Sequence, residues 1–300
     1  MEDALSTAPV PALPDTGLRR LVCVSLLCSG LLAAAPVSAD EAAEMVTLVN
    51  EYRVSGRDCA GDYSPPAGPL AASELLNRVP NITGQDLSSL LQRGGYQAAQ
   101  AQAVRVTGPE DVAMVMSVLT RQYCAVLMNP AYADIGVSRD GNQWQVVMAR
   151  SLLPSGMGDW EEAGREVLDL VNEVRGESRI CGDQAFASTL PLAWNDQLAN
   201  AALDHSHDMA KQSYFSHTGR DNSQVGDRVG RQGYAYQLIG ENLAAGHGSA
   251  KQAVAGWLMS PGHCANLMNP RYTEMGAAYV VNPASDSAIF WTQVLGAPRE

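Results

Sequence analysis

Two parts of this 300-residue chain repeat the same residues in the same order, and the repeat limits the possible folds more than composition does. The first matching pair covers residues 48–53 (LVNEYR) and 170–175 (LVNEVR), and a cysteine follows each after the same interval. The second pair covers residues 124–130 (CAVLMNP) and 264–270 (CANLMNP), each followed by a tyrosine and a glycine at identical offsets. These matches predict an internal duplication.

The duplication predicts two domains of about 100–150 residues each, long enough for each to bury a core. The predicted division is a leader peptide over 1–39, a first copy over 40–151, a linker over 152–158 and a second copy over 159–300. The predicted linker contains a proline and two glycines, which are typical of a connection between domains.

The copies differ in the middle. Between its two cysteines the first copy is 18 residues shorter than the second, and it contains no histidine. Counting back from the matched cysteines places Tyr123 opposite His263 and Ala101 opposite Glu241, and the region that would face His217 falls in the deletion. We therefore expect the first copy to have the frame of the second without its polar centre.

The N-terminus has the pattern of a signal peptide. Two arginines precede the apolar run 21–35, and small residues at Val37 and Ala39 offer a cleavage site before Asp40. The run is shorter than the ~20 residues that a membrane-spanning helix needs, although an uncleaved anchor is the alternative. We expect export to a periplasm or to the medium, with no membrane span after cleavage.

The net charge limits the classes of binding partner, and the cysteine count predicts disulfides. The net charge is −12 and the isoelectric point is about 4.8, which argues against nucleic acid and against an anionic membrane surface. Once the leader is removed, an even number of cysteines remains, which predicts two disulfides in an exported protein. Because each copy has one cysteine at each end of its frame, the expected pairs are Cys59–Cys124 and Cys181–Cys264.

Hydrophobic periodicity predicts helices and antiparallel strands. Helical spacing covers 40–52, 159–175, 196–212 and a segment from Ser249 to Met259, which we expect Pro261-Gly262 to end. Strand patterns cover 275–281 and 288–295 in the second copy, and 134–138 and 143–149 in the first. Helices that flank an antiparallel sheet indicate the α+β class.

The histidines divide by their local setting. His205 shares the apolar face of its helix and is expected to be buried, whereas His207 is expected in solvent; His247, between two glycines, has no clear role. His217 and His263 lie at the ends of predicted elements, where side chains can project into a cleft. Spacing alone does not bring these two together.

Several motifs of the second copy, taken in order, have the pattern of a known family. They are LAWN (192–195), residues 205–209, YFSHT (214–218), GEN (240–242), WLMSPGHCANLMNP (257–270) and WTQ (291–293). With these motifs, residues 165–300 resemble the CAP superfamily (SCP-like), which includes cysteine-rich secretory proteins, insect venom antigens and plant pathogenesis-related proteins, in its bacterial form. The first copy then resembles a degenerate CAP domain.

The resemblance implies a tandem of α-β-α sandwiches and, in the second, a cleft with two histidines and two acids. Carried over by motif, the histidines are His217 and His263, the first acid is Glu241, and Asn242 lies beside it. The position of the second acid holds Ser260 in this sequence. The resemblance implies a divalent-metal site on the two histidines, and the missing carboxylate predicts that Zn²⁺ or another divalent cation is held weakly.

The chemistry of Glu241 is open at this point. It can complete a metal site, orient an imidazole through a hydrogen bond, or act as a general base; with Asn242 it can also satisfy backbone groups under the sheet. Neither Ser206, Ser216 nor Ser260 lies in a Gly-x-Ser-x-Gly motif.

We therefore expect an exported, non-catalytic protein that binds a lipid, sterol-like or cell-envelope ligand. One alternative is a metal-dependent hydrolase of peptide or cell-wall bonds that uses Glu241 with His217 and His263. Another is a structural or interaction protein, with the first copy as a docking or dimerisation platform. The oligomeric state is left open by the sequence.

Overall fold

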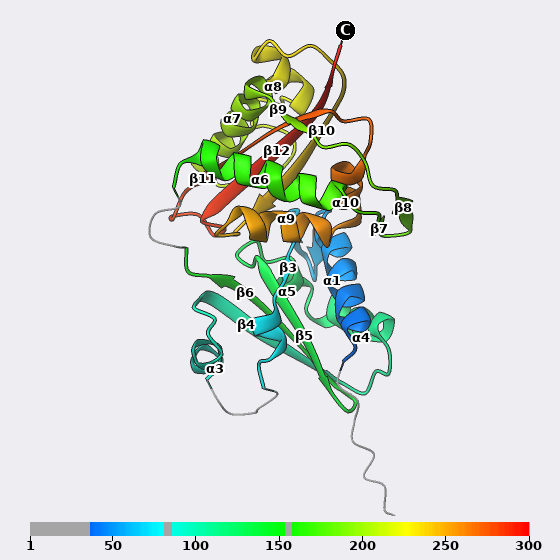
Figure 1. Ribbon diagram of the computed structural model, residues 1–300. Helices are drawn as coiled ribbons and strands as arrows, with labels where there is room; N and C mark the ends of the chain where they lie inside the picture. Colours follow the sequence, from blue (N-terminus) through cyan, green and yellow to red (C-terminus); the bar gives the residue numbers. More distant parts are fainter. Residues whose placement is uncertain (1–36, 81–85, 154–157, 300) are drawn as a thin grey trace, which may run out of the picture. The chain divides into compact units, whose positions relative to one another are not determined.

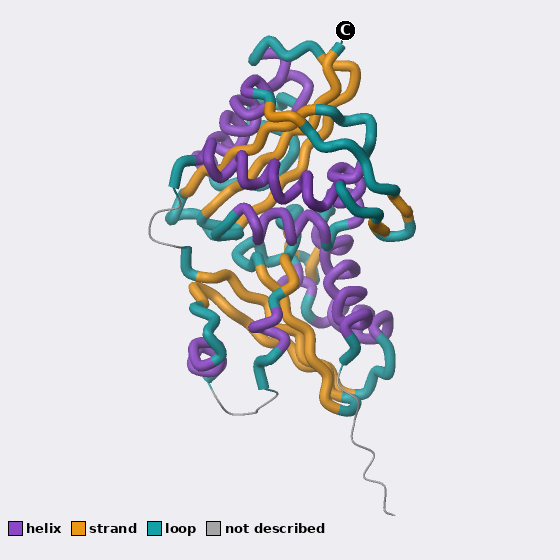
Figure 2. The backbone as a smooth tube through the Cα atoms, viewed as in Figure 1, coloured by secondary structure: helices purple, strands orange, loops and turns teal. Residues whose placement is uncertain are grey.

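A computed structural model of the protein describes residues 37–80, 86–153 and 158–299, shown in Figures 1 and 2. Most of the predicted leader peptide and of the predicted linker lies outside the described residues. Within those ranges, none of the helices combines the length and the apolar character that a membrane crossing requires.

The long helices begin where a polar side chain can accept backbone N–H groups that have no partner within the helix. Ser38 and Glu41 form a capping box at the start of α1 (Ala39–Arg53). Asp159 caps α6 (Trp160–Arg175), Asn195 caps α7 (Asp196–Gln212) and Ser249 caps α9 (Ala250–Leu258). The helices predicted over these stretches are therefore present, with bounds that differ by one or two residues at most.

The second half contains a four-stranded sheet in the order β10-β12-β11-β9. Its strands are β9 (Ala193–Trp194), β10 (Tyr236–Ala245), β11 (Glu274–Val281) and β12 (Ile289–Pro298). Consecutive residues of a strand point to opposite faces: Gly276 abuts Ala199 of α7, and Ala277 abuts Gly164 of α6. Helices therefore cover both faces of the sheet (Figure 1), and the expected α+β class is confirmed.

The first half contains a sheet in the order β3-β5-β6-β4. Its strands are β3 (Ala71–Ala72), β4 (Ala98–Thr107), β5 (Asp134–Asp140) and β6 (Gln143–Ser151). The accompanying helices are α2 (Glu74–Asn77), α3 (Leu87–Arg93), α4 (Val112–Gln122) and α5 (Cys124–Leu127). Figure 2 shows each sheet, in orange, with purple helices beside it. Each half also has a small hairpin, β1 (Arg57–Cys59) with β2 (Asp62–Ser64), and β7 (Arg179–Cys181) with β8 (Gln184–Phe186).

A fully buried arginine occupies the same place in each half. Arg175 donates to the backbone carbonyls of four residues, namely Leu190 (2.8 Å), Leu267 (2.7 Å), Asn269 (3.1 Å) and Tyr272 (3.2 Å). Arg53 donates to the carbonyls of the corresponding positions, Gly68, Leu127, Asn129 and Tyr132. Burial lowers the pKa of Arg53 to about 9 and that of Arg175 to about 10, so both side chains are protonated at neutral pH.

Two further hydrogen-bond pairs recur at corresponding positions. The side chain of Asn50 both donates to and accepts from the backbone of Leu70, and Asn172 does the same with Leu192. The Tyr96 hydroxyl donates to Asp134 at 2.6 Å, and the Tyr234 hydroxyl donates to Glu274 at 2.6 Å. The two halves thus satisfy the same buried polar groups in the same way.

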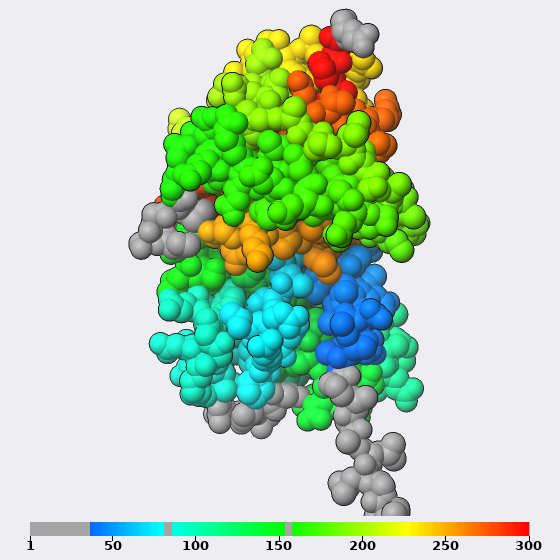
Figure 3. All heavy atoms as spheres, in the orientation of Figure 1, coloured from blue at the N-terminus to red at the C-terminus, as the bar shows by residue number. Residues whose placement is uncertain are grey.

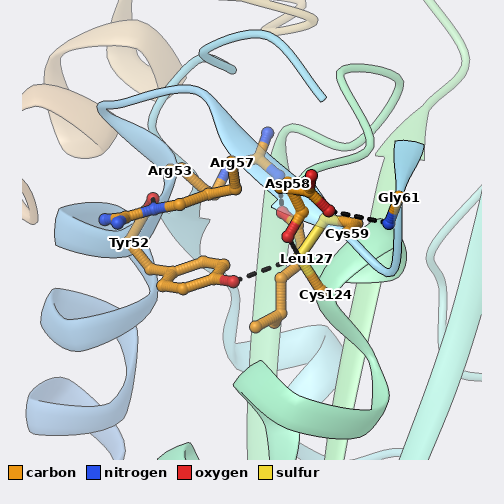
Figure 4. Close-up of a disulfide and its surroundings, with 8 residues drawn as sticks. All are labelled: Tyr52, Arg53, Arg57, Asp58, Cys59, Gly61, Cys124 and Leu127. Carbon is orange, nitrogen blue, oxygen red and sulfur yellow. Dashed lines mark hydrogen bonds between the residues drawn. A yellow bond between two sulfur atoms is a disulfide. The ribbon is translucent and has the colours of Figure 1, made fainter. Parts of the chain in front are cut away.

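The two expected disulfides, Cys59–Cys124 and Cys181–Cys264, are both formed. Each joins the small hairpin of its half to a short helix. Cys59 of β1 is bonded to Cys124 of α5, and Cys181 of β7 is bonded to Cys264 of the short helix 261–268. Figure 4 shows the first of them, with the Tyr52 hydroxyl 3.1 Å from the Cys124 sulfur and Arg53 beside it. Each bond could stabilise the fold by roughly 4 kcal/mol through loop closure, on the chain-entropy model.

The structure corrects the sequence-based prediction in several places. The helix predicted to stop before Pro261-Gly262 does end, at Leu258, but Pro261 then opens a further helix that was not predicted, α10 (Pro261–Met268), as proline can at a first helical position. Strands β4 and β10 were not predicted. The strand register also moves the counterpart of Glu241: Glu241 faces Val294 and Ala103 faces Val147, so Ala103 corresponds to Glu241, two residues beyond Ala101.

The described residues belong to one compact unit, and side chains join its halves. Asn50 Nδ2 donates to the Met259 carbonyl at 3.1 Å, His247 Nε2 donates to the Pro69 carbonyl at 3.0 Å, and Ser287 Oγ donates to the Pro130 carbonyl at 3.0 Å. Met259 also packs against the core of the first half. In Figure 3 the orange atoms of α9 lie directly against the first half.

Replacing Arg175 by methionine should leave the backbone carbonyls that it contacts without a donor in the core. We expect the free energy of unfolding to fall by about 3 kcal/mol or more, measured by urea denaturation. Arg165→Met, on the exposed side of the same helix, is the matched control and should cost less than about 1 kcal/mol. Equal effects of the two substitutions would contradict the anchoring role.

His247 should make the fold sensitive to acid. Burial lowers its pKa from 6.5 to about 4, since the protonated ring would lose its hydration. The unfolded chain therefore binds this proton first, and the stability present above pH 6.5 is lost as pH falls towards 4. Between pH 7 and 4.5 we expect roughly 2–3 kcal/mol from this residue alone.

The test compares urea unfolding of the wild type and His247→Gln at pH 7 and pH 4.5. Glutamine can still donate to Pro69 but does not titrate, so the variant should lose less stability on acidification. His207→Gln, at an exposed site, should behave as wild type. The same acid sensitivity in His247→Gln would rule out this residue as the cause.

Candidate functional site

Glu241 lies in β10, at one edge of the second sheet. It is adjacent to Asn242, so the two side chains point to opposite faces of the strand. Glu241 meets α8 (Val225–Arg231), and Asn242 meets α10. Because β10 is an outer strand of the sheet, groups from both faces can gather at its open side. The Glu241 side chain is only 3% exposed, so it needs partners that satisfy its charge.

His217 reaches Glu241 from the loop that follows α7. The helix ends at Ser213, whose left-handed backbone (φ 49°) turns the chain. The buried His205 of α7 then holds the loop, since its Nε2 donates to the Ser216 carbonyl at 2.9 Å. His217 Nδ1 donates to Glu241 Oε1 at 2.8 Å, while 55% of the His217 side chain remains exposed. The arrangement leaves the Nε2 of His217 available as an acceptor or a metal ligand.

Arg228 completes the environment of Glu241, and the sequence-based prediction missed it. Its side chain is 5% exposed and donates to Glu241 Oε2 at 2.7 Å. The same nitrogen donates to the His217 carbonyl at 3.0 Å, and the other terminal nitrogen donates to the Ser223 carbonyl at 2.9 Å. The GEN motif could have indicated a cation near Glu241, because a buried glutamate is rarely left without a cationic partner.

The Glu241 carboxylate is held in its charged form. Burial raises its pKa, but the hydrogen bond from His217 and the charges of His205, Arg228 and His217 outweigh burial, and the pKa lies below its ordinary value. Both oxygens are engaged, one by His217 and one by Arg228. A buried carboxylate of this kind is a poor proton acceptor at neutral pH; it is well placed to orient an imidazole.

His263 lies in the first turn of α10. Burial, together with the smaller effect of the His217 charge, lowers its pKa to about 3, so its ring is neutral at physiological pH. Its Nδ1 is buried without a hydrogen-bond partner. Asn242 supports this helix by donating to the His263 carbonyl at 3.3 Å, and Asn266 donates to the Asn242 oxygen at 2.9 Å. Asn242 therefore positions the backbone of the site.

Ser260 supplies no carboxylate. It is buried at the start of α10, and its side chain caps no backbone group of that helix. Over the ranges that the structure describes, histidine, cysteine and acidic side chains do not converge in threes on one point suitable for a metal. The nitrogen donors among the predicted site residues are two imidazoles, which fall short of the three protein ligands usual for catalytic zinc.

Two cavities flank the loop that carries His217. A polar one of about 690 Å³ opens between α7 and α8, and both Arg228 and His205 line it, together with Asp204, His207, Asp208, Lys211, Gln212, Asp221, Ser223 and Arg231. A smaller one of about 190 Å³ is mostly apolar. Its lining includes Tyr214 and Phe215 of the loop, Phe290, and the prolines Pro65, Pro66 and Pro130.

Comparisons with known proteins bear on the second half of the chain. Residues 168–295 match the model of the cysteine-rich secretory protein family (CAP). The uncharacterized membrane protein YlbC of Bacillus subtilis (strain 168) is 33% identical over 112 residues, which are 37% of this chain and 30% of YlbC. The uncharacterized protein YkwD of the same organism is 29% identical over 140 residues, 47% of this chain and 48% of YkwD. This chain thus spans less than half of either relative.

Among solved structures, an extracellular protein containing a SCP domain from Bacillus anthracis str. Ames is similar, with 27% identity and a TM-score of 0.39. The similarity covers 52% of each chain. The match to the family model includes His217, Glu241 and His263 and leaves the first half of the chain outside it. Residues 168–295 are therefore similar to the CAP family.

Proposed function

We propose that this protein binds a ligand in the cleft formed by His217, Glu241 and His263, and that it is not a hydrolase. The proposal rests on one observation: both carboxylate oxygens of Glu241 accept hydrogen bonds, one from His217 Nδ1 at 2.8 Å and one from Arg228 at 2.7 Å. In this arrangement Glu241 fixes the ring of His217 and directs Nε2 outward. A hydrolytic role would need a carboxylate that is free to take a proton from water.

A divalent cation is part of this proposal. His217 through its free Nε2, together with the neutral His263, would hold it, and Glu241 would be the carboxylate behind the first imidazole. When bound, the ion supplies a positive charge that recognises an electron-rich group of the ligand. The site has two protein ligands and lacks an acid at Ser260, so the affinity is expected to be modest.

The rest of the ligand is proposed to be an amphiphile, either a lipid or another component of a cell envelope. The apolar cavity near Phe215 supports this, because its roughly 190 Å³ fits a ring or a short stretch of acyl chain. That volume is below the ~300–1,000 Å³ typical of a site that encloses a whole small molecule. Only part of such a ligand would therefore be buried.

Export is proposed from the disulfides. Cys59–Cys124 and Cys181–Cys264 are formed, and such bonds persist mainly in oxidising compartments outside the cytosol. The signal peptide predicted over 1–39 is the proposed means of export. Cleavage after Ala39 would remove Ser38, the cap of α1, and leave Asp40 and Glu41 in the first turn, where acids favour a helix.

The first half is proposed to be a degenerate copy of the second that acts as a structural platform. The shared strand order and the matching contacts of Arg53 and Arg175 support the common origin. The contacts from Asn50 to Met259 and from His247 to Pro69 support the platform role, since they brace the segment that leads into α10.

Calorimetric titration with zinc on residues 40–300 tests the binding site. The wild type should bind, and the double variant His217→Ala/His263→Ala should not, because both imidazoles are lost. Glu241→Gln should weaken binding by about 10–100-fold without abolishing it, since it acts through His217. His207→Ala, which removes an exposed histidine from α7, is the control and should bind as wild type.

No zinc binding by the wild type would contradict the cation site, and equal binding by the double variant would place the metal elsewhere. Hydrolysis of peptide or cell-wall substrates that disappears in Glu241→Gln and survives in His207→Ala would overturn the non-catalytic assignment.

The platform role predicts that the second half depends on the first. Residues 152–300 expressed alone should have a lower urea midpoint than residues 40–300 and should self-associate, because Met259 and the His247 ring lose their cover. Light scattering and urea unfolding measure the two effects. Unchanged solubility, stability and zinc affinity in the shorter protein would contradict the role.

A further inference from the structure

We propose that Arg228 is a positioning residue of the cleft: it holds the His217 loop and the ionised Glu241 as one unit, so that the metal-binding nitrogen of His217 faces outward. This inference builds on the proposed function. Arg228 lies outside the sequence motifs that indicated the site, and outside the expected set of two histidines and two acids.

The first support is the connectivity of the guanidinium group. From α8 it contacts three separate segments, namely β10 through Glu241 and the two ends of one loop through the carbonyls of His217 and Ser223. A planar guanidinium holds several donors in a fixed geometry suited to bridging such partners, whereas a lysine ammonium is a compact charge on a flexible stem. Arg228 is thus the residue that closes the loop 217–223 against the strand.

The second support comes from the corresponding position in the first half. The backbone carbonyl of Arg228 accepts from the N–H of Gln232, and the carbonyl of Leu90 accepts from the N–H of Gly94. The next carbonyl in each half accepts from a tyrosine: that of Val229 from the N–H of Tyr234, and that of Leu91 from the N–H of Tyr96. Leu90, which is buried, therefore occupies the place of Arg228.

The residues that bond to the backbone are shared by the two halves, whereas the residues of the proposed cleft differ. The polar groups that satisfy the backbone are the same in both, as the pairs Arg53/Arg175 and Asn50/Asn172 show. The groups of the cleft are replaced together: Glu241 corresponds to Ala103, Arg228 to Leu90 and His263 to Tyr123. Arg228 thus groups with the cleft and not with the frame.

Physical chemistry explains why Arg228 and Glu241 would be replaced together. Removing one member of a buried ion pair leaves an uncompensated charge, whereas replacing both by apolar residues is often neutral or stabilising. The first half shows that leucine and alanine are accommodated at these two places in a fold with the same strand order.

The experiment is a cycle of four proteins: wild type, Arg228→Leu, Glu241→Ala and the double variant. Arg231→Leu, on the same helix and 58% exposed at the side chain, is the matched control, and Arg228→Lys tests whether charge alone suffices. Three quantities are measured for each protein: the urea midpoint, the zinc dissociation constant, and the ring ¹⁵N shifts of His217 with the attached proton on Nδ1.

We expect Arg228→Leu to lower the urea midpoint and the double variant to regain most of the loss. Zinc affinity should fall about tenfold or more in Arg228→Leu, even though both histidines are intact. The Nδ1–H signature of His217 should disappear or exchange with the other tautomer. Arg228→Lys should restore only part of the affinity, and Arg231→Leu should match the wild type in all three measurements.

Retention of the His217 tautomer and of zinc affinity in Arg228→Leu would overturn the proposal, since Arg228 would then only stabilise the fold. A double variant as unstable as Arg228→Leu would overturn the pairing on which it stands. If the wild type binds no zinc, the proposed function fails, and the His217 tautomer in Arg228→Leu still decides the role of Arg228.

Discussion

The structure depends on a buried arginine that ends the first helix of each half and satisfies backbone carbonyls far along the chain. In the second half, Arg175 contacts the carbonyl of Leu267, in the last turn of α10, and those of Asn269 and Tyr272, which follow the helix. The disulfide Cys181–Cys264 holds the same helix near its start. Because α10 carries His263 in its first turn, the contacts that stabilise the frame also determine where His263 lies. Charge burial is tolerated here since several carbonyl dipoles surround the guanidinium.

The frame was predictable from the sequence because its polar anchors are side chains with fixed partners. The matched segments LVNEYR and LVNEVR contain the asparagine and the arginine that bond to the backbone, and the cysteines mark the disulfides. Strands β4 and β10 were missed for a physical reason: each is an outer strand, and β10 has Glu241 and Asn242 where a simple alternation would need apolar residues. Tertiary partners satisfy these two side chains, and no local pattern reveals such partners.

The register of β10 and the cationic partner of Glu241 also depend on tertiary contacts that the sequence does not reveal. Counting from the cysteines assumed equal lengths and gave Ala101 opposite Glu241, whereas strand pairing gives Ala103. Arg228 was missed because its significance depends on the fold bringing α8 against β10, from a position 13 residues before Glu241. The motif around His217 could be read from the sequence, but the group that holds its carbonyl could not.

The polar residues of this protein therefore fall into two classes with different consequences for change. Arg175 and Asn172 satisfy the backbone, which is present in any sequence, so losing either leaves carbonyl or N–H groups unpaired whatever else changes. Glu241, Arg228 and His217 satisfy one another, so a single loss is costly and a joint loss costs little. A fold can accordingly retain its frame while its cleft is removed as a unit. The contacts of the two halves differ in the same sense: Tyr96 pairs with Asp134 as Tyr234 pairs with Glu274, while leucine and alanine occupy the positions that correspond to Arg228 and Glu241.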